Sequence, residues 1–151
     1  MIRPVTIDDL PAAVALGASM HHESYYAHLD YDPIKVMELG VLIVDNPSIY
    51  WGVVAEVDGE IVGFGAGYVA PHFFGHDLTS GDLAIFLTPE HRNGMVGVRM
   101  IKNYVQWCEE RGVKTPALGV SAGIKPERIG QLYERLGFTD KFTIYRRPLV
   151  C

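Results

Sequence analysis

The stretch 82–111 constrains the fold most, because a strand pattern, a glycine-bearing turn and a helix pattern follow one another in it without a gap. Residues 82–87 alternate with the period of two that is typical of a strand, which places Leu83 on the face opposite to Asp82. From residue 96 to residue 110, apolar side chains recur at the helical period instead. We therefore expect a sheet with at least one long helix packed on it.

The turn between this strand and this helix predicts an anion site. The free backbone N–H groups of a helix's first turn point out of the strand edge there, and the helix dipole favours negative charge at the same end. The segment 90–102 carries one acid against three bases, Arg92, Arg99 and Lys102, although the whole chain has a net charge of -5. A phosphate or pyrophosphate is the anion that best suits this place.

The segment from Leu87 to Ile101 resembles the acetyl-CoA-binding motif of the GNAT superfamily of N-acetyltransferases, Gln/Arg-x-x-Gly-x-Gly/Ala. Arg92 matches the first position of the motif and Gly97 the last, whereas Met95 stands where the family usually has its first glycine. The resemblance implies acetyl-CoA as cosubstrate. The cofactor-binding residues that it implies are Leu87, Thr88, Arg92, Asn93, Gly94, Met95, Val96 and Gly97.

A second segment, 131–138, resembles the other hallmark of this family, Leu-Tyr-x-x-Leu-Gly-Phe. Two motifs in the right order are far more specific than one, although Pro126 and Ile129 stand where Asn and Ala are usual. The resemblance covers essentially the whole chain. It implies an α+β fold in a single domain, residues 1–151, with a mixed central sheet of about six to seven strands and about four flanking helices.

The patterns along the chain give the order β-α-α-β-β-β-α-β-α-β, with room for a seventh strand. Asp58-Gly59 is the two-residue signal for a type I′ hairpin, and residues 71–81 are expected to form a loop. The elements outside the central stretch are expected at residues 2–6 (strand), 8–20 and 33–45 (helices), 51–57 and 60–68 (hairpin strands), 116–120 (strand), 126–136 (helix) and 142–147 (strand).

The glycine-rich and histidine-rich segments do not indicate other nucleotide or metal sites. Gly63, Gly65 and Gly67 lie inside an expected strand and open no helix, so the Rossmann interpretation fails; they are expected to permit a close approach or to mark a bulge. His72 and His76 lie in an expected loop without a third ligand cluster, so no metal site is expected.

The composition excludes several classes of function. The chain has 13 Lys and Arg against 18 Asp and Glu, which argues against nucleic-acid and anionic-membrane binding. No segment approaches the ~20 apolar residues of a membrane span, and no secretory signal is evident. The two cysteines, Cys108 on the expected apolar helix face and Cys151, do not suggest a disulfide framework, so a reducing cytoplasm is expected.

Acetyl transfer to an amine requires a deprotonated amine, stabilisation of charge on the thioester oxygen and a proton for the departing thiolate. By resemblance, the pantetheine arm lies along residues 82–87, the backbone N–H near Leu87 faces the thioester oxygen, and Tyr133 is the acid. Tyr133 also fits the apolar stripe of its helix, which is a purely structural role. The base is left open between Asp82 and Glu23, with His22, His72 or a chain of water molecules as alternatives.

The resemblance implies that the junction of the first two helices forms a wall of the acceptor site, with His21, Glu23, Tyr25 and Tyr26 near the acceptor. The alternative is that this junction is a solvated helix end with partly buried tyrosines. Nearby acids permit a cationic acceptor such as a polyamine, an aminoglycoside or lysine. These acids are Glu23, Asp30, Asp32 and Asp82. The competing function is a non-catalytic module that binds acyl-CoA or a partner protein. Edge strands and the pair Phe73-Phe74 suggest a homodimer.

Overall fold

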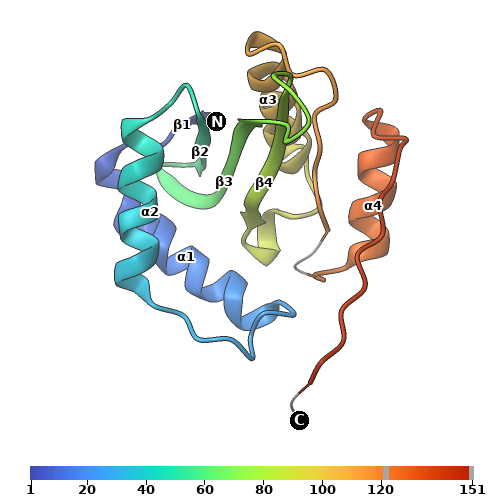
Figure 1. Ribbon diagram of the computed structural model, residues 1–151. Helices are drawn as coiled ribbons and strands as arrows, with labels where there is room; N and C mark the ends of the chain where they lie inside the picture. The colour runs from blue at the N-terminus through green and yellow to red at the C-terminus, as the bar shows by residue number, and fades with distance from the viewer. Residues whose placement is uncertain (121–122, 150–151) are drawn as a thin grey trace.

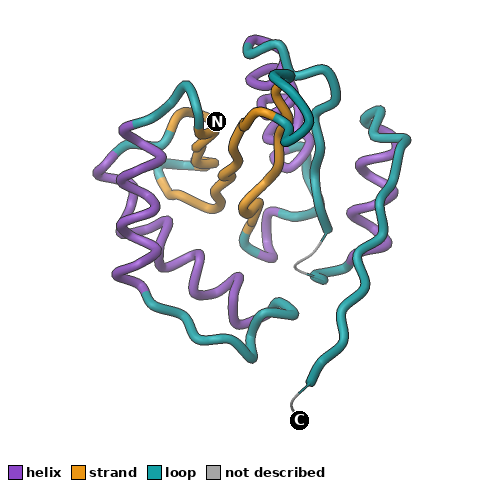
Figure 2. Tube along the Cα trace, in the orientation of Figure 1, coloured by secondary structure: helices purple, strands orange, loops and turns teal. Residues whose placement is uncertain are grey.

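The computed structural model describes residues 1–120 and 123–149, so Cys151 lies outside the described part of the chain. Four strands form one antiparallel sheet in the order β1-β2-β3-β4. The elements are β1 (Ile2–Pro4), α1 (Leu10–Glu23), α2 (Pro33–Asp45), β2 (Tyr50–Val57), β3 (Glu60–Pro71), β4 (Leu78–Leu87), α3 (Val96–Glu110) and α4 (Pro126–Arg135), with short 3-10 turns at Ile7–Asp9 and Pro89–His91. Helices lie on both sides of the strands (Figures 1 and 2).

The β2–β3 hairpin confirms the prediction made from Asp58-Gly59. Asp58 has φ 52° and Gly59 has φ 80°, the two positive values that a type I′ turn requires. α3 ends at Glu110, where the expected helical period ends. Gly112 then adopts φ 74°, and Val113 N–H donates back to the Cys108 carbonyl at 3.1 Å.

The core lies between the sheet and α3. Trp51, Met100 and Tyr104 are fully buried there, and the Trp51 and Tyr104 rings meet edge to face with centroids 5.0 Å apart. Trp51 Nε1 donates to Asn103 Oδ1 at 2.8 Å, which satisfies the one polar group of the indole. A side chain at Gly65 would overlap the Trp51 ring, so the predicted close approach at this strand is confirmed.

A β-bulge interrupts the pairing of β3 with β4, and it overturns one expectation about side-chain direction. Ala66 pairs with Ala84 while Gly67 pairs with Asp82, so Leu83 is the extra residue. Directly paired residues point to the same face, and Gly67 faces Tyr104 of α3. Asp82 therefore lies on the α3 face with Ile85, rather than on the opposite face as strict alternation predicts.

The expectation of a mixed sheet of six to seven strands is wrong for the part of the chain that the structure describes, where the sheet has four strands and every pair is antiparallel. Residues 116–120 do lie beside β4, but hydrogen bonds with side chains hold them there, and no backbone ladder forms. Ala117 N–H donates to Ser80 Oγ at 3.2 Å, and Tyr104 donates to the Ala117 carbonyl at 2.8 Å. Residues 142–147 are extended and exposed and pair with no described strand, because no described strand edge runs beside them (Figure 2).

Two element boundaries also differ from expectation. The loop expected over residues 71–81 is shorter, because Pro71 pairs with Leu78 and the strands continue to within a few residues of each other. The first helix continues past Met20 to Glu23, which brings His21 and Glu23 into the helix. Among the described helices, none combines the length and apolarity needed to cross a membrane.

Candidate active site

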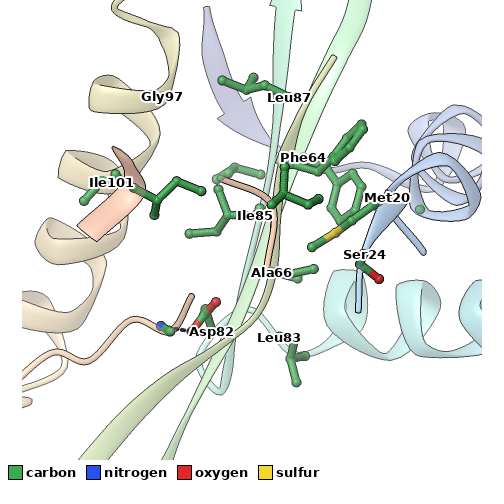
Figure 3. Close-up of a pocket in the computed structure, with 18 of the residues that line it drawn as sticks. Met20, Ser24, Phe64, Ala66, Asp82, Leu83, Ile85, Leu87, Gly97 and Ile101 are labelled. Carbon is green, nitrogen blue, oxygen red and sulfur yellow. Dashed lines mark hydrogen bonds between the residues drawn. The ribbon is translucent and has the colours of Figure 1, made fainter. Parts of the chain in front are cut away.

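A cavity of about 800 Å³ follows β4, and its wall comes from both faces of the sheet. On one side lie residues of α1 and α2, with Phe64 of β3; on the other lie the start of α3, residues of α4 and Gly119. Figure 3 shows Met20 and Ser24 on the α1 side of β4, and Gly97 and Ile101 on the α3 side. The turn predicted as an anion site and the wall predicted for the acceptor therefore line the same cavity.

The outer edge of β4 has no neighbouring strand in the described sheet. Thr88 N–H donates to the Val62 carbonyl of β3 at 2.9 Å. Because backbone groups point alternately to the two sides of a strand, the N–H and C=O of Leu87 point to the outer edge. Arg92 Nε donates to that C=O at 2.8 Å, which leaves the Leu87 N–H at the edge of the cavity.

The start of α3 has the geometry of an anion site. The first described bond within this helix region runs from Arg99 N–H to the Met95 carbonyl at 3.0 Å, so the N–H groups of residues 96–98 precede the helical ladder. Met95 has φ -85°, in the right-handed region that any residue adopts, and its side chain is 58% exposed. The substitution of the usual glycine by Met95 therefore imposes no backbone strain on this turn.

Arg92 is held by partners from two elements, β4 and α1. Besides the Leu87 carbonyl, its guanidinium pairs with Glu23 at the end of α1, with Nη1 donating to Oε2 at 3.1 Å. It also lies over the Phe86 ring, 5.1 Å from the centroid. The hydrogen bond from Arg92 lowers the pKa of Glu23, and the charges of Arg92 and Lys125 lower it further.

Arg128, in the first turns of α4, is a cation of the site that the sequence alone did not single out. Its guanidinium donates to Asn93 Oδ1, in the turn that precedes α3. Arg128 and Arg92 thus lie on the same turn from opposite sides of the cavity. The only sequence signal was a basic residue close before the second motif, and such residues are common on exposed helix faces.

Two of the predicted catalytic residues meet at the backbone of one residue, Gly119. Asp82 Oδ1 accepts from the Gly119 N–H at 2.7 Å, and the Tyr133 hydroxyl donates to the Gly119 carbonyl at 3.1 Å. Burial raises the pKa of Tyr133 well above its ordinary value, and the Asp82 charge raises it further. Burial also raises the pKa of Asp82, against the opposing hydrogen bond from Gly119.

The end of α4 explains why the second motif has its spacing. Gly137 adopts φ 97°, its N–H donates to the Glu134 carbonyl at 3.1 Å, and Phe138 N–H donates to the Tyr133 carbonyl at 3.0 Å. These are the two bonds of a Schellman motif. The Phe138 ring packs against Tyr133, with centroids 5.6 Å apart. The Leu-Gly-Phe ending therefore fixes the position of Tyr133 at the cavity.

The α1 side of the cavity contains one buried polar side-chain atom without a partner in the described residues. Tyr31 donates to the Val14 carbonyl at 2.7 Å, and Ser24 Oγ donates to the His21 carbonyl and accepts from Tyr26 N–H. His21 Nε2 is the one buried side-chain nitrogen or oxygen in residues 1–120 and 123–149 that has no hydrogen-bond partner. Leaving such an atom unsatisfied costs roughly 1–3 kcal/mol.

The remaining acids and histidines named from the sequence lie elsewhere or are already engaged. Asp32 caps α2 through the N–H groups of Ile34 and Lys35. The His72 ring packs on the Phe73 and Phe74 rings, away from the residues that line the cavity. In the described residues, no group of three or more His, Cys, Asp or Glu side chains is placed to hold a metal ion.

Comparison with known proteins agrees with this geometry. The fold is similar to that of a ribosomal-protein-alanine N-acetyltransferase from Brucella melitensis biovar Abortus 2308, with a TM-score of 0.71, 20% identity and 99% of each chain covered. It is also similar to a predicted acetyltransferase with acetyl-CoA from Clostridium acetobutylicum, with a TM-score of 0.73, 15% identity, and 99% of this chain and 96% of that chain covered. The glucosamine-6-phosphate N-acetyltransferase of Arabidopsis thaliana gives a TM-score of 0.75 at 15% identity, over 99% of this chain and 98% of that one.

Comparison with curated proteins finds no match. The model of the acetyltransferase (GNAT) family, however, matches residues 14–138, which include both motifs and all the residues that meet at Gly119. The chain therefore belongs to the GNAT family of acetyltransferases, whose members transfer acetyl groups from acetyl-CoA.

Proposed function

We propose that this chain is an N-acetyltransferase that transfers the acetyl group of acetyl-CoA to a primary amine of a small molecule or protein, by direct attack of the amine on the thioester. The observation that carries the proposal is the meeting of Asp82 and Tyr133 at the backbone of Gly119, beside the outer edge of β4. A base and an acid thus line the same cavity as an anion site.

The residues present fit acetyl-CoA. The N–H groups of residues 96–98 and the side chains of Arg92 and Arg128 would hold the diphosphate, with Gly97 leaving the helix start open. The outer edge of β4 would pair with the extended pantetheine arm, as an added strand does. Acetyl-CoA supplies an acetyl group activated as a thioester, and the Leu87 N–H is the donor for its oxygen.

The directions of the pKa shifts of Tyr133, Asp82 and Glu23 assign the proton-transfer roles. Tyr133 carries its proton at neutral pH, because the pKa of a tyrosine is ordinarily about 10 and burial raises it further here, so it has a proton to donate to the departing sulfur. Asp82, with a raised pKa, is a better base than Glu23, whose pKa Arg92 lowers. We therefore assign Asp82 to accept the amine proton and Glu23 to orient Arg92. The amine nitrogen forms the new bond to the carbonyl carbon while the carbon–sulfur bond breaks.

The alternative is a non-catalytic acyl-CoA-binding module, and one observation favours it. The hydroxyl of Tyr133 and the guanidinium of Arg92 both already have protein partners, so each must exchange a partner before it can act on a substrate. In either function a homodimer can form through exposed side chains such as Phe73 and Phe74.

The first experiment measures the thermal unfolding midpoint with and without saturating acetyl-CoA. A ligand at about 100 times its Kd adds ~2.7 kcal/mol, which raises the midpoint of a domain of this size by roughly 5 to 10 °C. No rise at millimolar acetyl-CoA in a folded sample would exclude both the enzyme and the acyl-CoA-binding module.

The second experiment separates those two functions through Tyr133→Phe. If Tyr133 is the acid, this change lowers kcat for thiol release on the order of 100-fold and leaves the acetyl-CoA shift in place. The matched control is Tyr145→Phe, which alters the same group on an exposed side chain and should change neither quantity. Equal turnover in the wild type and Tyr133→Phe would remove Tyr133 from the mechanism.

A further inference from the structure

We propose that the acceptor is a small monoamine with an apolar body and one hydroxyl group, and that His21 Nε2 binds this hydroxyl. The inference rests on the function proposed above and specifies its substrate class. It follows from the one unpartnered buried polar atom, from the apolar wall around it and from the engagement of the nearby acids.

The wall of the cavity on the α1 side is mostly apolar. Val14 and Met20 of α1, Phe64 of β3 and Leu83 at the bulge of β4 line it. In Figure 3 the Met20 and Phe64 side chains lie next to each other on this side of β4, above Leu83. A surface of this kind binds hydrocarbon or aromatic groups, and it offers nothing to the many hydrated nitrogens of a polyamine or an aminoglycoside.

The Tyr26 side chain on this wall is 36% exposed, so water can bond its hydroxyl; among the buried polar atoms of the described wall, one hydrogen-bonding position is open. Tyr31 and Ser24 already bond to backbone groups, whereas His21 Nε2 has no partner in the described residues. The nitrogen of a neutral imidazole either donates or accepts, depending on the tautomer. A hydroxyl both donates and accepts, so it matches either form of His21.

Three of the four acids named from the sequence are engaged: Glu23 pairs with Arg92, Asp82 Oδ1 accepts from Gly119, and Asp32 caps α2. The fourth, Asp30, is not among the described residues that line the cavity. A second or third ammonium group of an acceptor would therefore meet no free carboxylate in the described cavity wall. The reacting amine needs one carboxylate, and Asp82 can still accept its proton because a carboxylate has two oxygens. The cavity therefore suits an acceptor with one amine.

The test compares amines that differ by one hydroxyl: tyramine with phenethylamine, hydroxybenzylamine with benzylamine, and aminopentanol with pentylamine. Spermidine and kanamycin represent the polycations. We expect wild-type kcat/KM for thiol release to be about tenfold higher for the hydroxylated member of at least one pair, and to be lowest for the polycations. His21→Phe should abolish the preference while the amine without a hydroxyl keeps its kcat/KM within threefold.

His22→Phe is the matched control, because His22 is exposed, adjacent in sequence and absent from the described cavity wall. It should keep the wild-type preference. A preference for spermidine or kanamycin, or an unchanged hydroxyl preference in His21→Phe, would overturn the inference. If acetyl-CoA raises the unfolding midpoint but no amine of the panel is acetylated, the inference fails while acetyl-CoA binding stands. Without any acetyl-CoA shift, the proposed function itself fails.

Discussion

β4 and the segment 141–149 are both extended and both alternate in side-chain type, but their surroundings differ completely. In β4, Phe86 is 5% exposed, between β3 on one edge and helices on both faces. In the segment 141–149, Phe142 is 97% exposed, and the chain runs past α4 as an isolated tail (Figure 1). Its few contacts include Arg146, whose guanidinium lies 4.6 Å from the centroid of the Tyr25 ring.

An alternating sequence thus specifies an extended backbone. Whether that backbone becomes a buried strand depends on the edge of a neighbouring strand and on a helix that covers its face. β4 has both, because the β3 ladder and the core around Trp51 and Tyr104 hold it. The tail has neither in the described chain. The apolar side chains of the tail therefore contribute little to the free energy of unfolding of the single chain. Most of that free energy comes from the packing of the sheet against α3.

The largest effect is expected from Trp51→Ala, which removes the centre of the sheet core. Truncation of a buried aromatic side chain costs about 3–5 kcal/mol, and here it also leaves Asn103 without its indole partner. The free energy of unfolding from urea denaturation measures the loss. Phe73→Ala, at an exposed aromatic residue, is the control and should stay within about 0.5 kcal/mol of the wild type. A loss below 1 kcal/mol in Trp51→Ala would contradict the location of the core.

A smaller effect is expected at the start of the sheet, where Arg3 pairs with Asp9. Arg3 Nη1 donates to Asp9 Oδ2 at 2.7 Å, and Thr6 N–H donates to the same oxygen at 2.8 Å. The hydrogen bond from Arg3 holds the pKa of Asp9 well below its ordinary value. Asp9→Asn should therefore cost about 1–2 kcal/mol at pH 7.

The pH dependence of this difference follows from the direction of the shift. A lowered folded pKa stabilises the fold above the unfolded value of ~3.9, and that stabilisation is lost as the pH falls below it. The difference in free energy of unfolding between the wild type and Asp9→Asn should thus be at its maximum at pH 6 to 7 and become smaller below about pH 4. A gap that widens in acid would show that the Asp9 carboxylate is not stabilised in the folded state.

The smallest effect is expected from the double change Phe142→Ser and Ile144→Ser in the tail. Because both side chains are exposed, the free energy of unfolding should change by no more than about 0.5 kcal/mol. Size-exclusion chromatography beside the denaturation curve makes the result decisive. A loss above 2 kcal/mol with an unchanged elution volume would show that the tail packs against its own chain. The same loss with a shift to a smaller species would show that the tail packs against a second copy of the chain.

Local signals predicted much of the framework. Asp58-Gly59 predicted the hairpin, and the helical periods predicted the extents of α3 and α4, which end at Glu110 and Arg135, close to the expected residues 110 and 136. Each of these features depends on a few neighbouring residues, so the sequence contains the information that determines it. The same holds for the two family motifs, whose match is confirmed over residues 14–138.

What escaped prediction depends on contacts between distant segments. The ion pair of Arg92 with Glu23 joins residues far apart in the chain, and so does the bond of Arg128 to Asn93. Periodicity suggested a strand at residues 116–120, but the side chain of Ser80 and that of Asp82 take the N–H groups that a ladder would use. The unpartnered His21 nitrogen has no sequence signal, because it is defined by what the neighbouring side chains bind instead.

The bulge at Leu83 has a consequence for comparing members of this family. Asp82 stays opposite Gly67, so a chain that lacks Leu83 would keep the same facing pattern but would have an uninterrupted, less twisted strand. A one-residue gap at this point of an alignment would then distinguish chains whose site has a bulged β4 from chains whose site has a regular β4, even when their catalytic side chains are the same. The number of residues in β4 would therefore indicate whether the strand edge beside Gly119 is bulged or regular.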